Sequence, residues 1–208
     1  MVTSKTPTVF VVDDDASIRR ALARLLHSAG YQTETFSSAE GFLARSRFDA
    51  PGCIILDVRM PGLNGLELQQ ALAAADRQLP IVFITGHGDV PMSVRAMKAG
   101  AEDFLAKPFD DEELLKAVAQ ALNKSQREQN ARTEVAKIRR QLSSLTPRER
   151  EVLCHVVAGQ LNKQIASDLN IAEKTIKVHR ARVMEKMGAT SLAGLVAMAA
   201  RIGIHMPL

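Results

Sequence analysis

The sequence predicts an α/β domain with a five-stranded, doubly wound parallel sheet, followed by a helical linker and an all-α domain of four helices with a helix-turn-helix. Over residues 1–123 short apolar runs alternate with helical patterns, whereas only helical patterns follow residue 146. The charge changes as well: residues 1–123 hold 12 Lys and Arg against 16 Asp and Glu, and residues 124–208 hold 15 against 7. We therefore expect an acidic domain over 1–123, a linker over 124–143 and a basic domain over 144–208.

The first domain is predicted from five strand–helix repeats. Strands are expected at 8–12, 31–36, 53–56, 81–84 and 103–106, with amphipathic helical stretches between them and a last helix near 110–123. Repeated strand–helix units favour a parallel sheet that is covered by helices on both faces.

The remainder of the chain is predicted to be helical. Val135, Ile138, Leu142 and Leu145 keep a 3–4–3 spacing, which fits either a short coiled-coil seam or a solvated helical linker. Four helices are expected beyond it, near 147–158, 162–169, 173–187 and 191–202.

Composition narrows the class of protein. No segment approaches 18 uncharged apolar residues, and the first residues lack the apolar centre of a signal peptide. The two cysteines, Cys53 and Cys154, have no metal-site spacing and lie in apolar surroundings. We therefore expect a cytoplasmic protein with reduced cysteines and no membrane partner.

Polar residues follow four of the five predicted strands. The first strand ends at Asp13, Asp14 and Asp15, and Asp57, Thr85 and Lys107 follow the third, fourth and fifth strands. The carboxyl ends of parallel strands meet at one edge, where ligands of such sheets bind. Asp15 is expected to cap the next helix. The remaining carboxylates would suit Mg²⁺ or Mn²⁺, and a carboxylate beside a lysine and a hydroxyl could accept a phosphoryl group.

The chain has no GxxxxGK[ST] motif, so the phosphoryl donor would have to be another protein or a small phosphodonor. The motifs VVDDD, ILDVRMPG and ITGHGDVPMSVRAMKAGAEDFLAKPF resemble the flavodoxin-like receiver domain of two-component response regulators over residues 7–123. The resemblance implies that a sensor histidine kinase phosphorylates Asp57. It implies further that Asp14, Asp57 and the Arg59 backbone carbonyl hold Mg²⁺, and that Asp13 reaches the ion through water.

The same resemblance assigns phosphoryl-binding and switch roles. Lys107, ahead of a cis bond to Pro108, would contact the phosphoryl group, and Gly86 would leave room above it. Thr85 and Phe104 match the pair whose hydroxyl and ring move on phosphorylation, and His87 would flank the site.

The basic domain has helix-turn-helix spacing, because Asn170 lies four residues after Ala166 and Ile176 lies six residues after Asn170. On a helical projection Ile176, Val183 and Met187 share the buried face. The opposite side suits phosphates and base edges. The expected DNA contacts are Lys174, Thr175, Lys177, Val178, Ala181 and Arg182.

The segment from LTPREREVL to VMEKMGA resembles the LuxR-type DNA-binding domain, and the whole chain resembles FixJ-type response regulators, in the FixJ, StyR and TodT-like branch. The resemblance implies a transcriptional regulator and not an enzyme. Such a regulator binds double-stranded promoter DNA and forms a homodimer on phosphorylation. Relatives often carry a longer polar residue at Ala181. The alternative is a phosphorelay intermediate whose second domain binds a protein or RNA.

Overall fold

The computed structural model describes residues 6–45, 50–75, 79–86 and 90–204, with Val90 described by its backbone alone. The chain divides into two compact units, Met1–Gln129 and Asn130–Leu208. Within the described ranges no helix is both long enough and apolar enough to cross a membrane.

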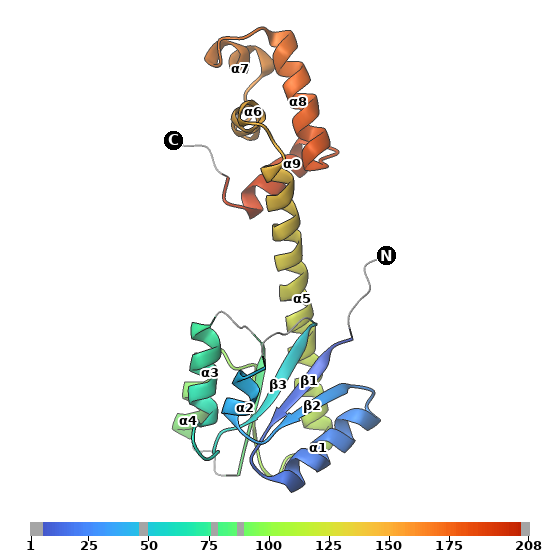
Figure 1. Cartoon of the computed structure of the whole chain (residues 1–208), viewed down its shortest axis with the longest axis vertical. Coiled ribbons are helices and arrows are strands. Elements are labelled where there is room, and N and C mark those ends of the chain that lie inside the picture. The colour runs from blue at the N-terminus through green and yellow to red at the C-terminus, as the bar shows by residue number, and fades with distance from the viewer. Residues whose placement is uncertain (1–5, 46–49, 76–78, 87–89, 205–208) are drawn as a thin grey trace. The chain divides into compact units, whose positions relative to one another are not determined.

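The first unit is built on a parallel sheet of five strands (Figure 1). The strands are β1 (Thr8–Val12), β2 (Gln32–Phe36), β3 (Gly52–Asp57), β4 (Ile81–Thr85) and β5 (Asp103–Ala106). Their order is β2-β1-β3-β4-β5, which confirms the predicted doubly wound sheet. Because Val12 pairs with Leu56 and Leu56 with Phe83, the carboxyl ends of β1, β3 and β4 lie at the same edge.

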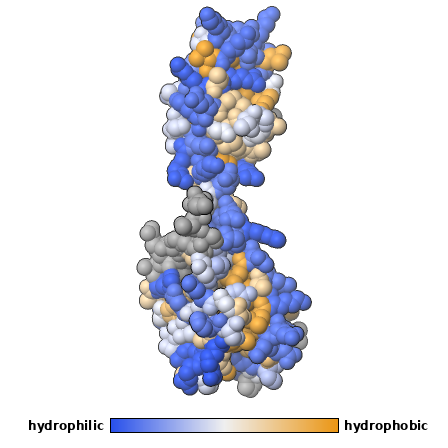
Figure 2. Space-filling view, turned by 90° about the vertical axis from the view of Figure 1, so that its right-hand side faces the viewer, coloured by the Kyte–Doolittle hydropathy of each residue, from blue (hydrophilic) through white to orange (hydrophobic). Residues whose placement is uncertain are grey.

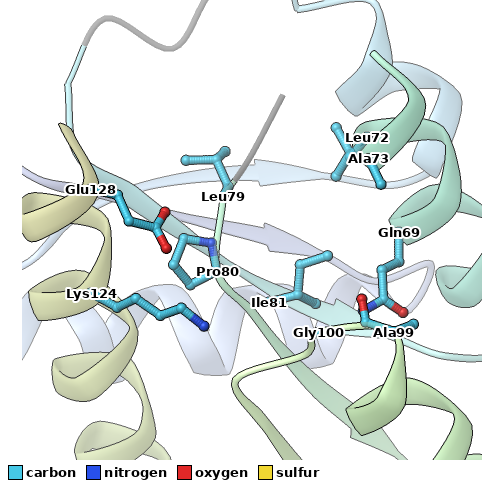
Figure 3. Close-up of a pocket in the computed structure, with 10 residues that line it drawn as sticks. All are labelled: Gln69, Leu72, Ala73, Leu79, Pro80, Ile81, Ala99, Gly100, Lys124 and Glu128. Atoms are coloured by element: carbon cyan, nitrogen blue, oxygen red, sulfur yellow. The ribbon is translucent and has the colours of Figure 1, made fainter. Parts of the chain in front are cut away.

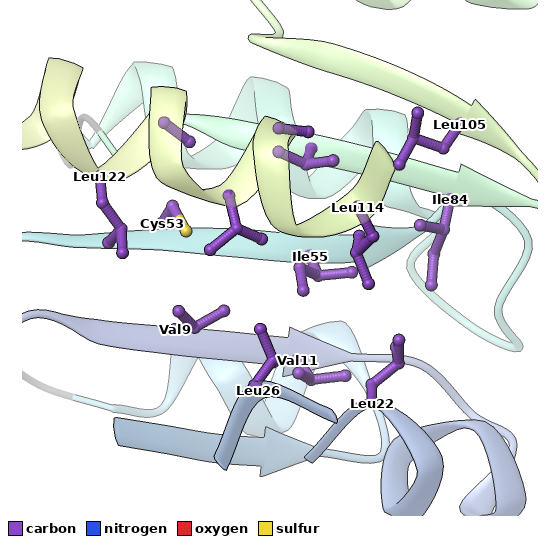
Figure 4. Close-up of a cluster of buried hydrophobic side chains, with 14 residues drawn as sticks. Val9, Val11, Leu22, Leu26, Cys53, Ile55, Ile84, Leu105, Leu114 and Leu122 are labelled. Carbon is purple, nitrogen blue, oxygen red and sulfur yellow. The ribbon is translucent and has the colours of Figure 1, made fainter. Parts of the chain in front are cut away.

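Helices cover both faces of this sheet. They are α1 (Ala16–Ser28), α2 (Ala39–Leu43), α3 (Gly65–Ala74), α4 (Val90–Lys98) and α5 (Asp111–Ser143). Side chains alternate along each strand, so Val9, Val11 and Ile55 pack with α1 and α5 (Figure 4), whereas Phe10, Ile54 and others pack with α2, α3 and α4. The strand β3 is buried along its whole length, which explains its unbroken apolar run.

Caps begin the helices that leave the carboxyl edge. Asp15 caps α1, as predicted, and its side chain accepts a hydrogen bond from Ser17 N at 2.7 Å. A capping box of Asn64 and Glu67 begins α3. Both helices therefore start directly beside the strand ends that carry the candidate site.

The second unit contains α6 (Pro147–Val157), α7 (Asn162–Asp168), α8 (Glu173–Met187) and α9 (Leu192–Arg201), close to the four predicted helices. Thr146 and Glu149 form a capping box at the start of α6. Asn170, at the predicted turn of the helix-turn-helix, has a positive φ of 53°. Ile176 is fully buried, and it anchors α8 on the other helices.

The end of α5 belongs to the core of this second unit. Ile138 is fully buried and Leu145 is 4% exposed, and Leu142 packs against the same cluster. Ile138, Leu142 and Leu145 therefore pack within the unit, whereas Val135, the first residue of the stripe, is half-buried and lies outside this cluster. The expected boundary after residue 123 falls inside α5, and the boundary after residue 143 falls at its last residue.

Candidate functional site

Three carboxylates meet at the carboxyl edge of the sheet. Asp13 follows β1, Asp14 comes next, and Asp57 is the last residue of β3. One oxygen from each lies within 4.8 Å of the others. Asp13 and Asp57 are buried, with 1% and 6% of their surface exposed, whereas Asp14 is exposed. The fold thus gathers residues that the sequence separates by more than 40 positions.

Asp13 is held through each of its polar groups. Its N–H donates to the Phe36 carbonyl at 3.2 Å, and its own carbonyl accepts from Arg19 Nη1 at 2.7 Å. One carboxylate oxygen accepts from Asp15 N and the other from Lys107 Nζ, both at 2.8 Å. Asp13 is therefore a fixed part of the site.

Asp57 is held less firmly. Among the described residues its side chain has one partner, the Lys107 ammonium, at 3.3 Å. Burial raises the pKa of Asp57, and the positive charge of Lys107 opposes that shift while the negative charges of Asp13 and Asp14 add to it. A carboxylate with few bonds, next to an ammonium group, is suited to nucleophilic attack.

Lys107 joins the two buried carboxylates. Its peptide bond to Pro108 is cis, as expected from the sequence. Burial lowers the pKa of Lys107, but the hydrogen bond and charge of Asp13, together with those of Asp57, outweigh burial and raise it. The side chain therefore remains a cation at neutral pH, and it can stabilise negative charge that develops beside Asp57.

The donor set suits a hard divalent cation. Clustered carboxylates repel one another unless a cation joins them, and oxygen ligands favour Mg²⁺ or Mn²⁺ over softer metals. Lys107 occupies one oxygen of Asp13, while Asp14 is exposed and Asp57 has a single partner in the described structure. Asp14 and Asp57 are thus the carboxylates best able to bind the ion directly.

Thr85 lies at the same edge and Phe104 lies one strand further out. Thr85 ends β4 and is fully buried, and its carbonyl accepts from Lys107 N at 2.7 Å. Phe104, in β5, packs its ring against Phe83 with centroids 6.3 Å apart. A Cβ added at Gly86 would meet no atom of the described residues within 4 Å. His87 lies outside the described residues.

The second unit presents the predicted DNA contacts on α8. All six are exposed, namely Lys174, Thr175, Lys177, Val178, Ala181 and Arg182. Val178 is 46% exposed, and Lys177 Nζ lies 3.3 Å from Glu173 Oε1, four residues earlier. The opposite face is buried as predicted through Ile176, Val183 and Met187. The helix therefore has a basic outer face on which Val178 is the one large apolar side chain.

Three polar contacts that no sequence motif indicates hold α8 and its turn. Lys186 Nζ lies 2.7 Å from the buried Glu149 Oε2, and Arg180 Nη1 donates to Asn162 Oδ1 at 3.1 Å. Arg148 Nη2 donates to the carbonyl of Leu169, next to the turn, at 2.8 Å. The hydrogen bond from Lys186 and one from Thr146 N lower the pKa of Glu149 to about 2.

Two pockets of the first unit are not lined by the three carboxylates. One, of about 300 Å³, lies at the amino ends of β4 and β5 between Leu72, Ile81, Gly100 and Lys124 (Figure 3). Apolar side chains also reach the surface of this unit (Figure 2), and a pocket of about 600 Å³ lies beside α1 and Phe109. Lys107 lines the second of these pockets, and Arg59 lines a third pocket of about 520 Å³, so residues of the candidate site reach both.

The fold and the two sites define a class of protein in which an acidic α/β domain is combined with a helix-turn-helix domain. Residues 9–119 match the "Response regulator receiver domain" family, and residues 143–199 match "Bacterial regulatory proteins, luxR family". The chain belongs to the two-component response regulators of the FixJ type, with a receiver domain and a LuxR-type DNA-binding domain.

Similar proteins span nearly the whole chain. Nodulation protein W of Bradyrhizobium diazoefficiens is 48% identical over 196 residues, which cover 94% of this chain and 86% of that protein. Transcriptional regulatory protein FixJ of the same organism is 43% identical over 196 residues, covering 94% and 96%. The solved structure of response regulator StyR has 50% identity and a TM-score of 0.86, and the match covers 95% of this chain and all of that one.

Proposed function

We propose that Asp57 accepts a phosphoryl group from a sensor histidine kinase, and that this modification controls transcription through DNA binding by α8. The observation that carries the proposal is the position of Asp57: a buried carboxylate with one ammonium partner, within 4.8 Å of two further carboxylates. The relatives' printed names, which include a transcriptional regulatory protein, support the second step. We place the protein in the cytoplasm, where a DNA-binding regulator meets its promoters.

The transfer follows from the chemistry of the site. A carboxylate oxygen of Asp57 attacks phosphorus, the bond between phosphorus and the donor's histidine nitrogen breaks, and the nitrogen keeps the electron pair. Lys107 Nζ, at 3.3 Å from Asp57, stabilises the charge on the phosphoryl oxygens. Asp14, Asp57 and the Arg59 carbonyl would hold Mg²⁺, with Asp13 bound through water, and the ion would supply further positive charge.

The response to phosphorylation uses residues at the adjacent strands. The Thr85 hydroxyl moves to the phosphoryl group, Phe104 turns inward, and the surface of α4 and β5 changes. Val94 and Met97 on α4 are 43% and 45% exposed, which supports a homodimer formed through this face. Leu192 and Val196 on α9 offer a similar apolar surface for a dimer contact in the second unit.

The two steps can be tested on the full chain. Wild-type protein and Asp57→Asn are incubated with a small phosphodonor such as acetyl phosphate and Mg²⁺, and the bound phosphate is measured by intact mass. Gel shifts against genomic DNA fragments follow, with and without the donor. We expect phosphate on the wild-type protein alone, and tighter DNA binding after phosphorylation. Equal phosphate on Asp57→Asn would contradict the assigned acceptor.

The gel shift also separates this function from a phosphorelay intermediate. Phosphate incorporation without binding to any duplex, with or without the donor, would favour a second domain that binds a protein or RNA.

A further inference from the structure

The loop between β3 and α3, residues 58–64, directly follows Asp57 and is closed at its base. Val58 N donates to the Ile84 carbonyl at 3.1 Å, and Gly65 N donates to the Val58 carbonyl at 3.0 Å. A Cβ at Gly65 would collide with the Asp57 carbonyl, so glycine is required for the two ends of the loop to come this close. These contacts hold the base of the loop but not its middle.

A second element holds the far side of the loop. Glu40, in the first turn of α2, accepts a hydrogen bond from Leu63 N at its Oε1, at 3.0 Å. This bond joins residues 23 positions apart. Ser38, the N-cap of α2, accepts from Gly41 N at 3.1 Å and holds the turn that carries Glu40.

The loop conformation next to Glu40 depends on a glycine. Gly62 has a φ of +74°, in the left-handed region, and a Cβ there would lie 2.8 Å from Glu40 Oε1. Glycine therefore serves both the turn and the close approach of the carboxylate. Arg59 lies between the closed base at Val58 and this second anchor, so both contacts limit where its carbonyl can point.

We propose that Glu40 is a positioning residue for Mg²⁺: by binding Leu63 N it holds the 58–64 loop, which carries the Arg59 carbonyl expected to bind the ion. The inference rests on the proposed function, because it assumes the metal site described there. Residues that orient a metal ligand without binding the metal themselves commonly lower metal affinity by roughly 10- to 100-fold when they are removed. For one of several ligands we expect the lower end of that range.

The experiment measures Mg²⁺ binding to the full chain by calorimetry, with the metal alone. Glu40→Ala loses the acceptor, and Glu40→Gln keeps a carbonyl oxygen but removes the charge. Glu112→Ala, an exposed acid on α5, is the matched control for the loss of a negative charge. We expect roughly tenfold weaker binding in Glu40→Ala, and near wild-type binding in Glu40→Gln and Glu112→Ala.

Hydrogen exchange gives a second readout that needs no metal. The Leu63 amide should exchange faster in Glu40→Ala than in the wild-type protein or in Glu40→Gln, with the amides of β3 unchanged. Unchanged Mg²⁺ affinity in Glu40→Ala would overturn the inference, as would equal losses in Glu40→Ala and Glu40→Gln, which would trace the effect to charge.

A failure of the underlying metal site would look different. In that case the wild-type protein itself would bind Mg²⁺ no better than Asp57→Asn, whatever residue stands at position 40. That result would overturn the metal site and the role of Glu40 together, whereas the outcomes above concern Glu40 alone.

Discussion

Lys107 binds Asp13 more closely than it binds the candidate phosphoacceptor. Its Nζ lies 2.8 Å from Asp13 Oδ2 and 3.3 Å from Asp57 Oδ1. Asp13 is also held by Arg19 and Asp15, so the lysine is anchored on the carboxylate other than the proposed phosphoacceptor. The ammonium group thus stays in place beside Asp57 while the longer contact leaves room for the bonding changes there.

Removing this ammonium group should make the fold depend on metal. In Lys107→Ala the buried carboxylates lose their cation, so we expect the free energy of unfolding in EDTA to fall by about 2 kcal/mol. Mg²⁺ should restore more stability to Lys107→Ala than to the wild-type protein. Thermal unfolding with EDTA and with Mg²⁺ measures both effects, and Lys116→Ala, at an exposed position, is the control. Equal stability in EDTA would contradict this account of the cluster.

The ionised carboxylate of Asp57 should destabilise the metal-free protein. Burial raises its pKa above the ordinary value of 3.8, so the folded state binds this proton more tightly than the unfolded state. The protonated carboxyl group of Asp57 therefore stabilises the folded state at low pH, and this stabilisation is lost as pH rises from 3.8 through the folded-state pKa. Asp57→Asn should be more stable than wild type at pH 7 in EDTA, by on the order of 1 kcal/mol. The difference should shrink toward pH 3.8 in thermal unfolding, and a difference that grows on acidification would refute the assignment.

Glu149 should show the opposite pH dependence. Its hydrogen bond with Lys186 lowers its pKa from 4.5 to about 2, so its contribution is complete above pH 4.5 and is lost as pH falls toward 2. Glu149→Gln should therefore be less stable than wild type at pH 7, and the two proteins should converge in acid. Urea unfolding followed by circular dichroism at several pH values tests this. Glu151→Gln, an exposed acid on the same helix, should show a much smaller effect.

The DNA surface should respond to the charge of two neighbouring residues on α8. Lys177→Ala removes a phosphate or base contact, so affinity should fall by about 1–3 kcal/mol and the salt dependence should become less steep. Glu173→Gln removes the acid that lies 3.3 Å from Lys177, so DNA binding should tighten. Gel shifts over a series of salt concentrations measure both changes. If Lys177→Ala binds every duplex as wild type does, α8 is not the reading helix.

A side-chain cap at the N-terminus of α7 should increase the stability of the second unit. Leu161 occupies the N-cap, has no side-chain capping bond, and is 69% exposed. Leu161→Ser would add a side-chain acceptor for an N–H of the first turn and should stabilise the second unit by about 1 kcal/mol. Urea unfolding measures the gain, with Leu161→Ala as the control. No gain over Leu161→Ala would show that the added hydroxyl does not cap α7.

The sequence predicted the parts of the site that depend on local pattern. Asp13, Asp57 and Lys107 each lie at the carboxyl end of a strand, and a parallel sheet brings its strand ends to one edge, so their approach follows from topology. Arg19 and Glu40 lie inside helices and reach the site through side chains. Whether such a side chain contacts Asp13 or Leu63 depends on how the helix packs, which no local pattern specifies.

The stripe at the end of α5 was open to two interpretations for a similar reason. Val135, Ile138 and Leu142 have the spacing of an amphipathic helix, and that spacing shows that one face is apolar without showing what covers it. In the structure the core of the second unit covers Ile138 and Leu142.

The burial of Ile138 also bears on how such regulators can be taken apart and recombined. A fragment that begins at residue 144 would expose the cluster that Ile138 and Leu142 fill, and a hybrid joined at that point would bring a foreign helix into it. A junction near residue 130, at the boundary between the two compact units, keeps these side chains with the helices they pack against. The folded unit that carries α8 is therefore longer than its helix-turn-helix, and it includes the end of the helix that leads from the receiver.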